Sequence, residues 1–179
     1  DDDMDFPILG LLSLEKRGIG MTSRTVANTW MERMPFSFVY TAEQVAYRNF
    51  VGSIWPPESA NYRNPFREWI GAQIRADIFG YACPGRPADA AELAFRDAAI
   101  SHTKNGIYGE MFVAAMIAAA FVSDDIEEII AAGLGEIPET SRLSEAIRNT
   151  QSWCREEGHW EKAWEKINEN LGHYHTVHT

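Results

Sequence analysis

The chain has 179 residues, 45% hydrophobic and 12% aromatic, which excludes a disordered or fibrous protein and predicts one domain with a sizeable core. Lys and Arg number 16 against 26 Asp and Glu, and the net charge of −10 argues against binding to nucleic acid or to an anionic membrane surface. The two cysteines, Cys83 and Cys154, are too few for a disulfide framework and favour reduced thiols in a cytoplasmic protein.

Apolar residues recur at spacings of three and four along most of the chain, and no alternation with a period of two is long enough to indicate a sheet. The pattern predicts an all-α domain of roughly eight helices, whose ends are placed to within about two to four residues. In chain order, we expect helical segments over residues 6–17, 23–34, 41–52, 66–77, 87–101, 107–122, 126–133, 141–156 and 159–171.

Some helix ends carry recognisable signals. Ser23 is expected to cap the second helix, and Thr41 with the Ala-Glu-Gln that follows it approximates a capping box. The proline-rich stretch 53–67 is expected to be an ordered loop, because it also contains Trp and Tyr. Near the end of the chain, the spacing of Trp160 and Trp164 predicts that both side chains face the core.

The longest apolar stretch, Ile107–Val122, is short for a bilayer span and is interrupted by Glu110. It therefore predicts a buried core helix, and we expect no membrane segment.

Four carboxylates lie within the first five residues, Asp1-Asp2-Asp3-Met4-Asp5, just before the first expected helix. Adjacent carboxylates raise one another's pKa by repulsion unless a hard divalent cation such as Mg²⁺, Mn²⁺ or Ca²⁺ neutralises them. The alternative is an acidic terminus that only stabilises the start of the helix.

Two internal segments and the tail are further candidates. Gly71-Ala72 leaves room either for a phosphate near the backbone or for a close helix contact. His102 stands in a loop before an Ala-rich helix, where it either contacts an anion or a metal-bound hydroxyl or is structural. The tail His173-Tyr174-His175-Thr176-Val177-His178 could bind Zn²⁺ or Ni²⁺, but lacks nearby Cys or carboxylate ligands, so packing or capping is favoured.

Three of these segments resemble motifs of the ADP-ribosylglycohydrolase family. The acidic start followed by an apolar helix is similar to the Thr-Asp-Asp-Thr-Glu segment that supplies metal ligands in the family. Residues 70–75, Ile-Gly-Ala-Gln-Ile-Arg, are similar to Asn-Gly-Ala-Ala-Met-Arg, and residues 101–109 resemble the Ser/Thr-His loop that precedes a long Ala-rich helix. The residues to which the resemblance assigns roles are the metal ligands Asp1, Asp2 and Asp3 and the substrate contacts Gly71, Ala72 and His102.

The resemblance implies a compact orthogonal helical bundle with a dinuclear Mg²⁺ or Mn²⁺ site. The implied activity is hydrolysis of a glycosidic bond to ADP-ribose, on a protein or small-molecule acceptor. The family's second set of metal ligands, an Asp-x-Asp-Thr segment, does not occur in this sequence, so we expect one helical domain over residues 1–179 that is incomplete at both ends. For the same reason no residue is assigned as the general base.

Two alternatives stay open. A non-catalytic, ADP-ribose-binding or purely structural member of the same fold is favoured by Met4 and Ile70, which depart from the family's polar residues. A helical interaction domain with an exposed aromatic loop around Trp55 and Tyr62 is the other.

Overall fold

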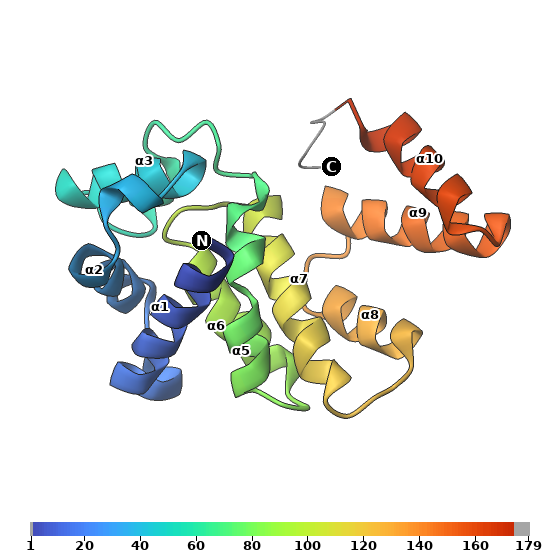
Figure 1. Cartoon of the computed structure of the whole chain (residues 1–179), viewed down its shortest axis with the longest axis horizontal. Coiled ribbons are helices and arrows are strands. Elements are labelled where there is room, and N and C mark those ends of the chain that lie inside the picture. The colour runs from blue at the N-terminus through green and yellow to red at the C-terminus, as the bar shows by residue number, and fades with distance from the viewer. Residues whose placement is uncertain (1, 174–179) are drawn as a thin grey trace. The chain divides into compact units, whose positions relative to one another are not determined.

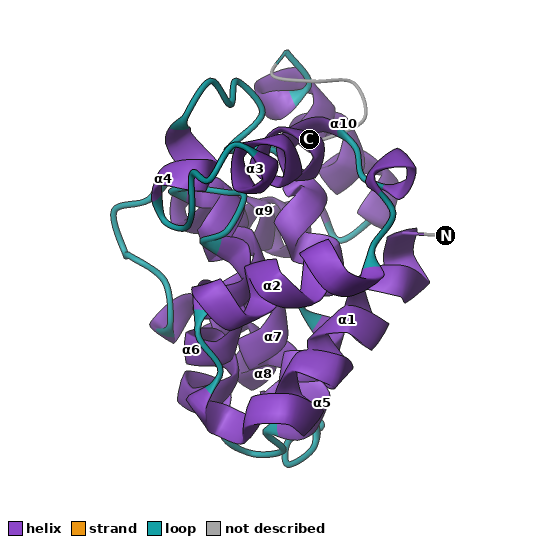
Figure 2. Cartoon of the chain, turned by 90° about the vertical axis from the view of Figure 1, so that its left-hand side faces the viewer, coloured by secondary structure: helices purple, strands orange, loops and turns teal. Residues whose placement is uncertain are grey.

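The structure is a computed structural model that describes residues 2–173, and within these residues every regular element is helical (Figures 1 and 2). The ten α-helices are α1 (Asp2–Arg17), α2 (Ser23–Arg33), α3 (Thr41–Val51), α4 (Glu58–Asn61), α5 (Asp77–Ala82), α6 (Pro87–Ala98), α7 (Asn105–Ala120), α8 (Ile126–Gly135), α9 (Arg142–Glu157) and α10 (Trp160–Leu171). The three 3₁₀ helices are η1 (Gly18–Gly20), η2 (Phe36–Phe38) and η3 (Ile70–Arg75). The all-α prediction is confirmed.

The described chain divides into two compact units, the first ending at Ile137 and the second beginning at Pro138. The first unit contains α1 to α8 and the main hydrophobic core. In the second unit, α9 packs against α10. The expectation of one domain over residues 1–179 stays a prediction.

Helix α7 is the element around which the first unit is built, and in Figure 1 it runs between α5 and α8. It packs against α5, α6, α8 and η3. Ala114 and Ala118 of α7 and Ala90 and Ala94 of α6 are all fully buried. Because alanine side chains are small, the backbones of the two helices can approach closely. Glu110 lies in the middle of α7 and is buried as completely as these alanines.

Helix α1 begins at Asp2, four residues before the predicted start at Phe6. Asp2, Asp3 and Asp5 therefore form the first turn of the helix rather than a segment that precedes it. Negative charge in the first turn is favourable, because it faces the positive end of the helix dipole. The helix packs against α2, α5 and η3 and buries Phe6 and Leu9.

Two predicted caps are wrong. Thr22, not Ser23, caps α2, and its hydroxyl accepts a hydrogen bond of 3.2 Å from the Thr25 amide.

Thr41 forms no capping box, because it is the first residue of α3 and Tyr40 is the N-cap. Gln44 Nε2 donates over 3.2 Å to the Val39 carbonyl. The Glu43 side chain is buried in the core, where it forms an ion pair.

The helix expected over residues 66–77 is replaced by the 3₁₀ helix η3. A 3₁₀ helix has about three residues per turn, so Ala72 and Arg75 lie on the same side of η3, and both are buried.

The prediction that Trp160 and Trp164 face the core is also wrong. Their side chains are 74% and 58% exposed, and Ala163 is the buried residue of α10. Among the residues that the structure describes, no helix is long and apolar enough to cross a membrane.

Candidate functional site

The acidic start of α1 is the first part of the candidate site. Asp2 and Asp5 are half-buried and Asp3 is exposed, while Asp1 lies outside the described residues. Carboxylate oxygens in a first helical turn suit a hard cation such as Mg²⁺ or Mn²⁺. Between residues 2 and 173, however, no three His, Cys, Asp or Glu side chains are gathered closely enough to hold a metal ion. Asp2 and Asp3 therefore fit a metal as part of a ligand set, not as a complete one.

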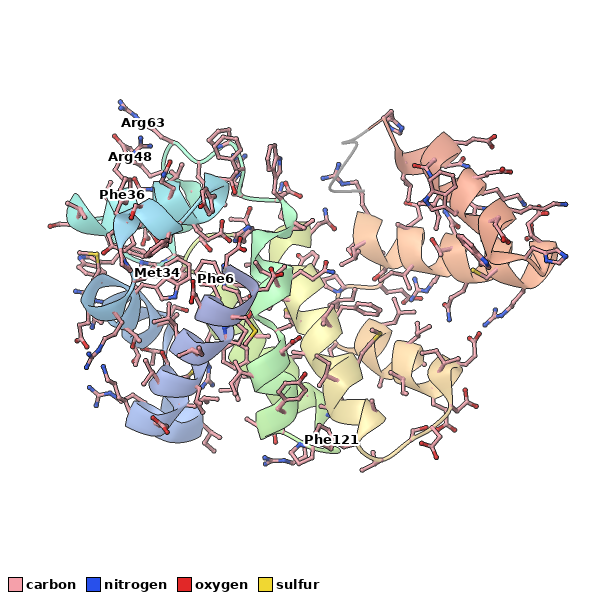
Figure 3. All side chains as sticks on the ribbon, viewed as in Figure 1. Phe6, Met34, Phe36, Arg48, Arg63 and Phe121 are labelled. Carbon is pink, nitrogen blue, oxygen red and sulfur yellow. The ribbon has the colours of Figure 1, made fainter. Side chains whose placement is uncertain are left out.

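The aromatic ring of Phe6 lies directly behind this acidic turn. Figure 3 shows Phe6 in the interior of the first unit, between the ribbons of α1 and α3. The ring packs against Trp30 of α2, with 4.9 Å between the ring centroids. The guanidinium carbon of Arg75 lies 5.6 Å from the Phe6 centroid and 5.2 Å from the Trp30 centroid. Both distances are within the range of cation–π interactions.

Arg75 is 1% exposed and forms ion pairs with three buried carboxyl groups. Its Nε donates to Asp97 Oδ2 on α6, and its Nη1 donates to Glu43 Oε1 on α3 over 3.0 Å. Its Nη2 lies 3.5 Å from Glu110 Oε2 on α7. Nη1 also donates over 3.3 Å to the hydroxyl of Ser101, in the loop that follows α6. The guanidinium of η3 is thereby joined to three helices and one loop.

One arginine cannot neutralise three carboxylates, and the pKa shifts follow from this imbalance. Burial, reinforced by the charge of Asp97, raises the pKa of Glu110 well above its ordinary value, although Arg75 opposes the shift. Burial likewise raises the pKa of Glu43 against the attraction of Arg75. Neither Glu110 oxygen has a hydrogen-bond partner, although both oxygens are buried. A protonated carboxyl group carries no charge, so it is easier to bury in this position than a carboxylate.

Gly71 is half-buried and lies against the Glu43 carboxyl group. A Cβ atom at residue 71 would come within 2.2 Å of Glu43 Oε1, so only glycine fits beside this side chain. Its neighbour Ala72 is fully buried in a small cluster with Ala98, Ala99 and Ile107. The small residues of η3 thus serve a close packing contact within the protein.

His102 is 1% exposed, so its imidazole does not face solvent. Its Nδ1 shares a hydrogen bond of 2.9 Å with Ser101, and its Nε2 lies 3.8 Å from Glu43 Oε1 without a hydrogen-bond partner. Burial, with the nearby charge of Arg75, holds the pKa of His102 well below its ordinary value. His102 is therefore neutral at physiological pH.

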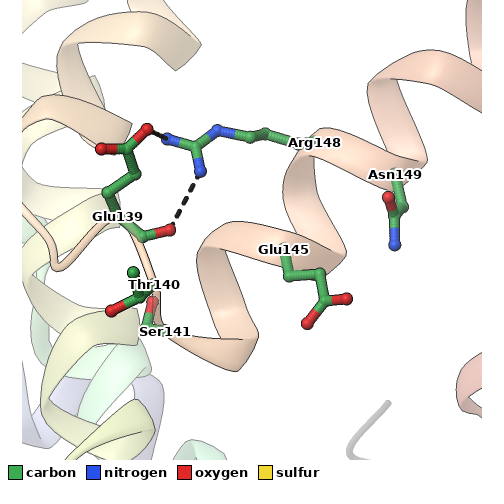
Figure 4. Close-up of a pocket in the computed structure, with 6 residues that line it drawn as sticks. All are labelled: Glu139, Thr140, Ser141, Glu145, Arg148 and Asn149. Carbon is green, nitrogen blue, oxygen red and sulfur yellow. Dashed lines mark hydrogen bonds and ion pairs between the residues drawn. The ribbon is translucent and has the colours of Figure 1, made fainter.

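Two surface hollows lie elsewhere in the described chain. One, of about 300 Å³, is in the second unit and includes Ser141, Glu145 and Arg148 (Figure 4). Arg148 there donates to the Glu139 carbonyl over 3.0 Å. The other, of about 370 Å³, lies beside Arg48, Tyr62 and Arg63 at the end of α3. Neither hollow is lined by a residue that the sequence singled out as a metal ligand or substrate contact.

Gly71 and His102 are brought to one buried cluster, with Glu43 as their common neighbour. Sequence reasoning missed Glu43, Asp97 and Glu110 as members of this cluster. Glu110 carried a usable signal, since it is a charged residue in the middle of an apolar helix. The imidazoles of the tail beyond His173 lie outside the described residues.

Comparison with known proteins identifies the family. The chain matches the family model described as ADP-ribosylglycohydrolase over residues 2–179. No curated protein and no solved structure matches it. The resemblance seen in three short segments thus extends over essentially the whole sequence, and the chain belongs to the ADP-ribosylglycohydrolase family.

Proposed function

We propose that the protein hydrolyses a glycosidic bond to ADP-ribose with the help of Mg²⁺ or Mn²⁺. The bond between the ribose anomeric carbon and the nitrogen or oxygen of the acceptor breaks. Water supplies the hydroxyl group of the released ADP-ribose and the proton of the acceptor. Membership of the ADP-ribosylglycohydrolase family is the observation that carries this proposal.

The acidic first turn of α1 supports a metal-dependent reaction. Asp2 and Asp3 place two carboxylates, which are hard oxygen ligands, at the start of α1, and Asp1 directly precedes them in the sequence. Asp2 and Asp3 would hold a divalent cation as part of its ligand set, and the cation would supply Lewis-acid polarisation of the scissile centre and orientation of water or the ribose hydroxyls. The helix start would keep the two carboxylates in a fixed arrangement.

The roles of Gly71, Ala72 and His102 are more indirect in this proposal. Gly71 and Ala72 belong to η3, whose backbone would lie along the nucleotide. His102 is buried and shares a hydrogen bond with Ser101, so it supports the loop that follows α6. In this arrangement its contribution is to shape the site rather than to transfer a proton.

The test is an assay of ADP-ribose release from ADP-ribosyl-arginine and ADP-ribosyl-serine, with Mg²⁺, with Mn²⁺ and with a chelator. The wild-type chain should release ADP-ribose from at least one substrate only when the cation is present. The double variant Asp2→Asn/Asp3→Asn should lose at least about 100-fold in rate, because amide oxygens carry no charge to hold the metal.

The matched control is Asp124→Asn/Asp125→Asn, which removes the same two charges just before α8. Asparagine still caps a helix, so this control should keep the wild-type rate. Binding of ADP-ribose without release from either substrate would support the non-catalytic alternative. Release that persists in the chelator would contradict the metal-dependent proposal.

A further inference from the structure

We propose that Arg75 is the positioning residue of the candidate site, and that it fixes the first turn of α1 through the ring of Phe6. The same guanidinium holds the neighbours of Gly71 and His102. The effect of Arg75 on metal binding rests on the proposed function, whereas its effect on the position of the first turn of α1 does not.

The first step is the orientation of the guanidinium. Each of its three nitrogens donates a hydrogen bond: Nε donates to the Asp97 carboxylate, Nη1 to Glu43, and Nη2 to the Asp97 carbonyl over 3.3 Å, while Glu110 Oε2 lies 3.5 Å from Nη2. These partners come from α3, α6 and α7, which are separate elements of the first unit. A planar group held from three sides has one orientation. The guanidinium of Arg75 is therefore fixed in orientation.

The second step is the contact between the guanidinium and α1. The guanidinium carbon lies within 6 Å of the centroids of both Phe6 and Trp30. Phe6 is 4% exposed and packs against both Arg75 and Trp30, which also lie against each other. Asp2 and Asp3 precede Phe6 by four and three residues, which places all three on the same side of the helix. A shift of the Phe6 ring consequently moves the two carboxylates.

The third step concerns Glu43, which connects Arg75 to the other two segments. Its Oε1 accepts from Arg75, lies 3.8 Å from His102 Nε2, and occupies the space beside Gly71. Arg75 also donates to Ser101, which bonds to His102. Without the guanidinium, Glu43 and Ser101 would lose the donor that fixes them.

Arginine is required for this role because lysine lacks both the fork and the flat face. The test compares Arg75→Lys, which keeps the charge, with Phe6→Leu, which keeps an apolar side chain but removes the ring. Phe50→Leu is the matched control, because Phe50 is a buried aromatic that stacks on Trp55 and not on Arg75. Each of the three substitutions changes a buried side chain of the first unit.

The first readout is hydrogen exchange at the amides of Phe6, Ile8 and Leu9, which are the first amides of α1 that donate within the helix. We expect exchange at these amides, relative to the most protected amides of α7, to be about tenfold faster in Arg75→Lys and Phe6→Leu. In Phe50→Leu this ratio should stay at its wild-type value.

The second readout is the dissociation constant for Mn²⁺, measured from the electron paramagnetic resonance signal of the free ion. Loss of residues that orient metal ligands typically costs about 10- to 100-fold in affinity, and we expect a loss in this range for Arg75→Lys and Phe6→Leu. Phe50→Leu should bind Mn²⁺ as the wild-type chain does.

Each outcome decides the proposal. If neither variant changes the Mn²⁺ affinity of a wild-type chain that binds the ion, Arg75 does not position the site. If the wild-type chain binds no Mn²⁺, the proposed function fails, and the exchange ratios alone decide whether Arg75 fixes α1. If Arg75→Lys does not fold, Phe6→Leu decides, since it leaves the ion cluster intact.

Discussion

Glu110 holds a proton more tightly in the folded protein than in the unfolded chain. Burial and the charge of Asp97 raise its pKa well above the ordinary value of 4.5. Above pH 4.5 the folded state therefore binds more protons than the unfolded state, so the free energy of unfolding falls as the pH rises toward the raised pKa.

His102 acts in the opposite sense. Burial lowers its pKa well below the ordinary value of 6.5, so the folded state resists the proton that the unfolded imidazole accepts. Its contribution to stability is present above pH 6.5 and is lost as the pH falls below that value. The two buried groups together favour maximal stability in a mildly acidic range, between the two ordinary values.

We predict that Glu110→Gln makes the free energy of unfolding less dependent on pH. Glutamine is neutral and has nearly the shape of a protonated glutamate, so the loss of stability between pH 5 and pH 8 should become smaller. Urea denaturation followed by circular dichroism at several pH values measures this slope. Glu169→Gln, in an exposed position of α10, is the control and should keep the wild-type slope. Equal slopes in all three proteins would mean that Glu110 is ionised in the folded state.

At the scale of elements, η3 and α3 meet where the Glu43 carboxyl group lies over Gly71. Glu43 is 3% exposed and bonded to Arg75, so its side chain has nowhere to move. The φ angle of residue 71 does not require glycine. The contact with Glu43 therefore explains why a glycine occurs at this position of η3.

We predict that Gly71→Ala lowers the free energy of unfolding by about 1–3 kcal/mol, the usual cost of an added methyl group in a packed core. Gly135→Ala is the matched control at the end of α8, where an added Cβ meets nothing within 4 Å. There the higher helix propensity of alanine should raise stability by up to about 1 kcal/mol. Chemical denaturation measures both changes. A neutral effect of Gly71→Ala would mean that Glu43 can leave its place beside η3 at little cost.

The elements that could be predicted from the sequence are those whose signals are local. The long apolar stretch of residues 107–122 needed no knowledge of the rest of the chain, and the buried helix that it predicts is confirmed as α7. The capping box at Thr41 failed because α3 begins one residue earlier than the motif requires, with Tyr40 as its N-cap. A local pattern does not decide between two adjacent positions for a helix start.

The candidate site was predictable only in part. The acidic first turn is contiguous in sequence, so its charge alone makes it a candidate, and the family resemblance then assigns Asp2 and Asp3 as ligands, which stays a prediction. The ion cluster of Arg75 draws its carboxyl groups from three helices that are distant in sequence. No spacing rule connects such residues, and only the fold brings them together.

At the scale of the whole molecule, the two units differ in how much they bury. Helix α7 has eight buried residues, whereas α9 and α10 have one each, Ser144 and Ala163. Helices with few buried contacts open with a lower free energy than core helices.

We therefore predict two levels of protection in hydrogen exchange. Amides of α9 and α10 should exchange faster than amides of α6 and α7 under native conditions, because less apolar surface has to be exposed for the former to open. Mass spectrometry of peptic fragments at increasing exchange times measures this difference. Uniform protection across all four helices would show that the second unit opens only when the first unit unfolds.

The central claim is that the chain uses its acidic first turn to bind a divalent cation that takes part in ADP-ribose hydrolysis. Calorimetric titration with Mn²⁺, and then with ADP-ribose in the presence and absence of Mn²⁺, tests it most directly. We predict Mn²⁺ binding that is lost in Asp2→Asn/Asp3→Asn and kept in Asp124→Asn/Asp125→Asn, and ADP-ribose binding that is tighter with Mn²⁺ present. A wild-type chain that is folded and yet binds neither Mn²⁺ nor ADP-ribose would contradict the claim.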